Sequence, residues 1–201
     1  RVGVFLVELK DRDMSALQKD RMPKMSDAQM TPAQKKAVKE FLVARKTTEF
    51  EGPFVPLLRS PEMLSRARNL GDYVRFNTSL PSRLSEFVIL ITAQYWRQEY
   101  EWFVHSGIAA REGLASETIA AVADGNRPRK MADDEAVVYD FCMELLTERE
   151  VSDRNYDRLK LHFEEEGIVD TVGIIGYYSL LAMVMNTART ALPEGVEPAF
   201  A

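Results

Sequence analysis

Apolar residues recur every three or four positions along most of the chain, which is the period of amphipathic helices. In 31-TPAQ-34, Thr31 can cap a helix and Gln34 can close a capping box, so we expect a helix over about 32–48. The segment 50–61 contains Gly and Pro breakers and is predicted to be a loop. Similar start signals and apolar stripes predict further helices over about 61–74, 83–113, 116–125, 133–148, 152–167 and 170–192.

The last of these segments, 170–192, is apolar on nearly every side, and Pro193 follows it. A helix of that kind is buried in the middle of a bundle or between subunits. The sequence shows no alternation of strands with helices and no Gly-rich phosphate loop. We therefore expect an all-α protein of six to eight helices, with one domain over 30–193, an N-terminal arm or extension over 1–29 and a tail over 194–201.

The N-terminal stretch 2-VGVFLVEL-9 is too short for a membrane span and lacks the cleavage site of a secretory signal. Met14 resembles a natural start, so residues 1–13 are either an added extension or a strand-like arm that pairs with another subunit. No uninterrupted apolar run reaches the 18 to 20 residues that a span needs, so we expect no membrane partner.

Composition excludes several classes of function. The 201 residues carry a net charge of −5, which argues against nucleic-acid binding, and the short run 127-RPRK-130 is predicted to be a solvated loop. Cys142 is the sole cysteine, which excludes an intramolecular disulfide and a CxxC redox pair. Its apolar surroundings predict a buried thiol, and a reducing compartment, the cytoplasm, fits best.

Candidate chemistry is concentrated in 94-QYWRQEYEWFVH-105. On one continuous helix, Gln98, Glu101 and His105 share a face, with Tyr95 and Trp102 at its edges. Glu101 and His105 are four residues apart, so the carboxylate can orient the imidazole for proton transfer. The same spacing is also common in exposed ion pairs and in aromatic core packing, and that alternative remains open.

The remaining titratable residues change this picture little. Glu86 lies well off the face of His105 on a straight helix and joins the site only if the helix bends. Glu101 and His105 supply two metal ligands with no third in the pattern, so no metal site is expected. The other histidine, His162, and the run 164-EEE-166 belong to a highly charged segment that we predict to be solvated.

The block 83-RLSEFVILITAQYWRQEYEWFVHSGIAAREGL-114 resembles the signature of the carboxymuconolactone decarboxylase family, which shares its fold with the AhpD alkylhydroperoxidase proteins. The resemblance rests on Glu86, an apolar stretch, His105, a small-residue segment and 113-GL-114. It extends over about 30–193, with supporting flanks at 31-TPAQ-34, 52-GPFVPLLRSPEM-63, 71-GDYVRFNTSLP-81 and 176-GYYSLLAMVMNT-187.

The resemblance implies an AhpD-like helical bundle that forms a homo-oligomer, a trimer or a hexamer. The redox branch of the family places a CxxC pair before the histidine, where this chain has Gln98 and Glu101, so thiol hydroperoxidase chemistry is not expected. The decarboxylase branch implies cofactor-free conversion of 4-carboxymuconolactone, a small carboxylated lactone, to 3-oxoadipate enol-lactone. The alternative is a non-catalytic binding or assembly protein on the same fold.

On this hypothesis His105 donates a proton to the substrate carbon, and Glu101 or Glu86 orients it. Gln98 is expected to hydrogen-bond the lactone or a carboxylate, and an arginine is expected to bind a substrate carboxylate. The candidates for that arginine are Arg83 and Arg75, and the expected pocket walls are Tyr95, Trp102 and Tyr177.

Overall fold

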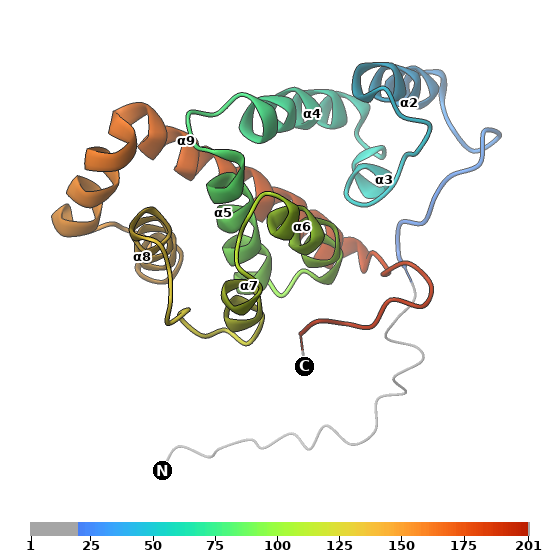
Figure 1. Ribbon diagram of the computed structural model, residues 1–201. Helices are drawn as coiled ribbons and strands as arrows, with labels where there is room; N and C mark the ends of the chain where they lie inside the picture. Colours follow the sequence, from blue (N-terminus) through green and yellow to red (C-terminus); the bar gives the residue numbers. More distant parts are fainter. Residues whose placement is uncertain (1–19, 201) are drawn as a thin grey trace, which may run out of the picture.

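The computed structural model describes residues 20–200 of the protein, and this part of the chain contains eight helices and no strand (Figure 1). Residues 1–19, most of the predicted N-terminal arm, lie outside the described residues. The helices are α2 (Pro32–Arg45), α3 (Phe54–Leu57), α4 (Pro61–Phe76), α5 (Ser82–Tyr95), α6 (Glu99–Arg111), α7 (Ser116–Ala123), α8 (Asp133–Glu148) and α9 (Asp153–Ala188).

The predicted capping box at the start of α2 is confirmed. Thr31 Oγ1 accepts from the backbone N–H of Gln34, and Gln34 Oε1 accepts from the backbone N–H of Thr31 at 2.9 Å. These two bonds satisfy amides that have no partner inside the helix. The predicted loop at 50–61 contains the short helix α3, which follows Gly52 and Pro53 and includes Pro56.

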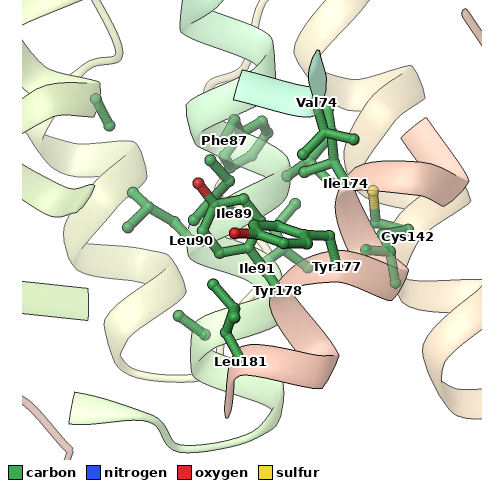
Figure 2. Packing of buried hydrophobic residues seen from close by; sticks show 14 of the residues in the cluster. Val74, Phe87, Ile89, Leu90, Ile91, Cys142, Ile174, Tyr177, Tyr178 and Leu181 are labelled. Carbon is green, nitrogen blue, oxygen red and sulfur yellow. The ribbon is translucent and has the colours of Figure 1, made fainter. Parts of the chain in front are cut away.

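Helix α5 forms the centre of the bundle, because its residues from Leu84 to Ala93 are all buried. It packs against α6, α8 and α9, and Figure 2 shows its apolar side chains facing Ile174, Tyr177 and Leu181 of α9. The continuous apolar sequence 87-FVILITA-93 is therefore explained by burial on every side of the helix.

The prediction of one continuous helix over 83–113 is wrong. Helix α5 ends at Tyr95, Arg97 has a left-handed backbone with φ 49°, and α6 starts at Glu99 and folds back against α5. Gln98 caps the new helix, because its Oε1 accepts from the backbone N–H of Tyr100 and from that of Glu101. The break contains neither Gly nor Pro, so the sequence carries none of the usual signals for it.

The boundary between the two predicted C-terminal helices is also displaced. They form the single element α9, which breaks at Glu164 (φ 57°, ψ −169°) and continues through Gly167, where we expected the first helix to end. The second half is not buried on every side, because Val169, Val172 and Met183 are exposed in the single chain. Assembly into a trimer or hexamer stays a prediction.

By length and composition, α9 is also the one helix among residues 20–200 that is long and apolar enough to cross a membrane. The length and apolar character of α9 were not recognised from the sequence, because polar residues interrupt its apolar run. Half of its most apolar window is buried inside the protein, as in the core helix of a soluble bundle.

Candidate functional site

The break between α5 and α6 brings Glu86 against His105. His105 Nδ1 lies 2.7 Å from Glu86 Oε2, and both side chains are buried. Since a carboxylate can only accept, Nδ1–H donates to it, which fixes the ring and leaves Nε2 for other chemistry. Neither carboxyl oxygen of Glu101 has a hydrogen-bond partner in the described chain, so the predicted Glu101–His105 pair is not formed.

His105 lies in the wall of a cavity of about 370 Å³, which is large enough for a small organic ligand. Helices α2, α3, α4, α6 and α9 and the loop before α3 contribute to it. Its apolar lining comes from residues that include Phe41, Phe54, Phe76, Val104 and Leu181, and its polar lining comprises Arg45, Thr47, Glu49, Glu51, Arg75, Tyr100, Glu101, His105, Tyr177 and Tyr178.

The two arginines of the cavity differ in their partners. Arg45 Nε lies 2.8 Å from Asp72 Oδ1 in an ion pair. Arg75 contacts the ring of Phe76, and within residues 20–200 it forms no ion pair with a carboxylate. The guanidinium group of Arg75 is therefore available to an anionic ligand, and its role in binding a carboxylate stays a prediction.

Burial raises the pKa of three acidic groups of the cavity and so favours their neutral form. It raises the pKa of Glu101 well above its ordinary value of 4.5, and that of Tyr177 to about 12. It also raises the pKa of Tyr178 well above 10.0, and the ring of Tyr178 stands edge-on to His105 with 5.0 Å between centroids. Burial therefore favours un-ionised O–H groups in the cavity wall that contains the imidazole.

Comparison with known proteins identifies the architecture. No protein-family model matches the chain, and no curated protein matches it. A crystal structure described as the alkylhydroperoxidase AhpD core of an uncharacterized peroxidase-related protein from Ralstonia eutropha JMP134 superposes with a TM-score of 0.70, at 16% identity over 87% of this chain and 92% of that chain. The chain has the AhpD-like fold.

Two further structures share this fold. A protein of unknown function from Agrobacterium tumefaciens, described as a putative antioxidant defence protein AhpD, gives a TM-score of 0.59 at 20% identity over 73% of this chain and 100% of its own. A variant of the debrominase Bmp8 in complex with 2,3,4-tribromopyrrole gives a TM-score of 0.64 at 13% identity, over 86% of this chain and 91% of its own. The AhpD-like fold thus includes peroxidase-related and debrominase proteins.

Arg83, the other candidate for binding a substrate carboxylate, is engaged elsewhere in this AhpD-like bundle. It forms ion pairs with Asp134, at 2.6 Å, and with Glu135, both at the start of α8. Its guanidinium group therefore joins α5 to α8 and does not line the cavity. The sequence analysis could not foresee this pairing, because the partners are about 50 residues away.

Besides Arg83 and Glu86, the predicted site residues Gln98, Tyr95 and Trp102 also lie outside the cavity lining. Gln98 caps α6 and donates to Asn186 Oδ1 at 3.1 Å. Tyr95 is half-exposed at the end of α5, and Trp102 packs edge-on against Phe200 of the C-terminal tail. These residues were placed by the assumption of one straight helix, and the break turns them away from His105.

Several cavity residues were missed by the sequence analysis. Tyr178 lies next to the predicted Tyr177, and Arg45 and Glu49 belong to α2 and the segment after it. The signal for Tyr178 was available, because the adjacent tyrosines interrupt an otherwise aliphatic helix. Arg45 and Glu49 could not be found, because only the packing of α2 against α4 places them near His105.

Gly71 of α4 provides space for Tyr177. A Cβ at position 71 would lie 2.2 Å from Tyr177 Oη, whereas a Cβ at Gly176 of α9 would have no atom within 4 Å. We expect Gly71→Ala to lower the free energy of unfolding by about 1–3 kcal/mol through this clash. Gly176→Ala should raise it by about 0.5–1 kcal/mol, because alanine favours helix. Urea denaturation checks both, and equal effects would contradict the assigned contact.

The structure gives no support to thiol chemistry at this site. Cys142 is fully buried in α8, and burial raises the pKa of its thiol, so the reactive thiolate is disfavoured. Cys142 also does not line the cavity. Within residues 20–200, His, Cys, Asp and Glu side chains form no group of three that could hold a metal ion.

Proposed function

We propose that the protein is a carboxymuconolactone decarboxylase-like lyase that removes CO2 from a small carboxylated lactone without a cofactor. The observation that carries the proposal is the His105–Glu86 pair beside a cavity that also contains Arg75, which has no carboxylate partner among residues 20–200. An oriented imidazole and a cation for the substrate carboxylate are what such a reaction needs. The resemblance around Glu86 and His105 supports the same reaction.

In the proposed complex, Arg75 binds a substrate carboxylate through two parallel N–H donors. Arg45 faces the same cavity but is held in an ion pair with Asp72, which also pairs with Arg68, so the guanidinium group of Arg45 is less available to a ligand than that of Arg75. Glu49 and Glu51 also line the cavity and oppose additional negative charge. 4-Carboxymuconolactone carries two carboxylates, so a lactone or keto acid with one carboxylate is an equally suitable candidate for Arg75.

The proposed reaction breaks the bond between the substrate carbon and its carboxylate. CO2 leaves, and the electron pair moves into the unsaturated lactone to give a dienolate. His105, protonated and hydrogen-bonded to Glu86, then donates its Nε2 proton to the ring carbon and is reprotonated from solvent. The apolar and aromatic walls exclude water, which strengthens the electrostatic interactions inside the cavity.

The proposal is tested by incubating the purified protein with 4-carboxymuconolactone and measuring CO2 and the enol-lactone. We expect turnover, with Arg75→Gln raising KM by roughly 10- to 100-fold, because a hydrogen bond to a charged group is lost. Arg66→Gln is the matched control on α4, since Arg66 is exposed and pairs with Glu62. Failure of the folded protein to decarboxylate this substrate and related mono-carboxylated lactones would refute the lyase and favour a binding protein.

A further inference from the structure

Among the described residues, the cavity wall has four buried polar atoms without a hydrogen-bond partner. One is Arg45 Nε, which faces Asp72 in an ion pair, and the other three are both carboxyl oxygens of Glu101 and the hydroxyl oxygen of Tyr177. Glu101 and Tyr177 are each only 3% exposed. Buried polar atoms are nearly always hydrogen-bonded in folded proteins, so unpartnered atoms need an explanation. Their grouping around one cavity indicates that a ligand atom completes their hydrogen bonds.

The surroundings determine which hydrogen-bonding role these groups have. Glu101 forms no hydrogen bond or ion pair with the nearby polar side chains of Glu86, His105 and Tyr178. Burial raises the pKa of both Glu101 and Tyr177, which favours the neutral form of each, the form that has one O–H group to donate. The space left by Gly71 receives the Tyr177 hydroxyl, which holds this donor in place.

We propose that Glu101 and Tyr177 form an oxyanion-binding pair, in which two neutral O–H groups donate hydrogen bonds to one negatively charged oxygen of the ligand. The inference rests on the proposed function for the identity of that oxygen, which is the dienolate oxygen formed as CO2 leaves. The pair only donates hydrogen bonds and transfers no proton, since the proton for the ring carbon comes from His105. This proposed role of Glu101 differs from the one predicted from the sequence, which was to orient His105.

The arrangement has the physical features of an effective oxyanion site. Both donors lie in a buried environment, where hydrogen bonds to a developing charge are strong, and packing against Gly71 holds Tyr177 before the reaction. A carboxylic acid kept neutral by an apolar site can donate to an oxyanion, whereas an ionised carboxylate would repel it. The positive charge of Arg75 is then left for the substrate carboxylate.

The donor pair can be tested without turnover by measuring the binding of 4-hydroxy-3-nitrobenzoate. This probe has a carboxylate for Arg75 and a phenolate oxygen that stands in for the dienolate, and its visible absorbance reports ionisation. We expect the wild-type protein to bind the phenolate form. Glu101→Leu and Tyr177→Phe should each weaken binding by roughly 10- to 100-fold, because each removes one hydrogen bond to a charged oxygen.

Glu101→Gln is the matched control, because its amide remains neutral and keeps an N–H donor, so it should restore most of the affinity lost in Glu101→Leu. Absent binding by the wild-type protein, or unchanged affinity in folded Glu101→Leu and Tyr177→Phe, overturns the pair. If the probe results hold and no lactone is decarboxylated, the pair stands and the proposed reaction fails. If decarboxylation occurs and both variants retain full probe affinity, the reaction stands and the pair fails.

Discussion

Replacing His105 with alanine should lower the turnover of 4-carboxymuconolactone by about 10² to 10⁴, which is the contribution of a general acid held next to its substrate. Only His105 combines an oriented imidazole with a place in the cavity wall. The measurement is kcat by CO2 release under saturating substrate, with circular dichroism to show that the variant is folded.

The control for this prediction is the other histidine of the chain. His162 is paired at 3.4 Å with the exposed Asp133, outside the cavity, so His162→Ala should keep full turnover. Added imidazole should partly restore turnover to His105→Ala, because the substitution leaves room in the cavity for it. If His105→Ala keeps the wild-type kcat, His105 is not the proton donor.

Glu86 should behave as a positioning residue. Glu86→Gln keeps the shape of the side chain but loses the charge that faces His105 Nδ1, and a charged hydrogen bond contributes about 1.5–3 kcal/mol. The effect should therefore fall on kcat and leave KM nearly unchanged, since Glu86 does not line the cavity. A change confined to KM would argue against this role.

The helix boundaries were largely predictable from the sequence, because local signals determine them. The capping box of Thr31 and Gln34, for example, acts within four residues and is found as expected. The break at Arg97 was not predictable in this way, since it is stabilised by Gln98 as a cap and by packing of α6 on α5. The type of fold followed from local patterns, while this one turn required tertiary contacts.

The same turn decides how much of the site could be predicted. His105 was identified, and both glutamates were considered, but a straight helix placed Glu101 against His105 and moved Glu86 away. Because α6 folds back against α5 after the break, Glu86 and not Glu101 contacts His105. The carboxyl group of Glu101 has no hydrogen-bond partner among the described residues. Residue spacing can rank candidate side chains on one helix, but it cannot assign contacts across a break.

The unpartnered carboxyl of Glu101 should destabilise the protein as pH rises. Its pKa is raised above the ordinary value of 4.5 by burial, so between 4.5 and the folded-state pKa the folded protein holds a proton that the unfolded chain has released. The unfolded state is then favoured with increasing pH, at up to about 1.4 kcal/mol per pH unit. Glu101→Gln cannot ionise and should lack this loss.

The measurable quantity is the free energy of unfolding of Glu101→Gln minus that of the wild-type protein, from urea denaturation between about pH 5 and pH 7. We expect the difference to grow with pH, by up to about 3 kcal/mol over this interval. Glu117 is the control, because its backbone hydrogen bond and the Ser116 hydroxyl lower its pKa, so its carboxyl titrates below this interval and Glu117→Gln should give a difference that stays constant with pH. A difference for Glu101 that stays constant with pH would mean that the carboxyl ionises as freely in the folded protein as in the unfolded chain, and a neutral donor at this position would then be excluded.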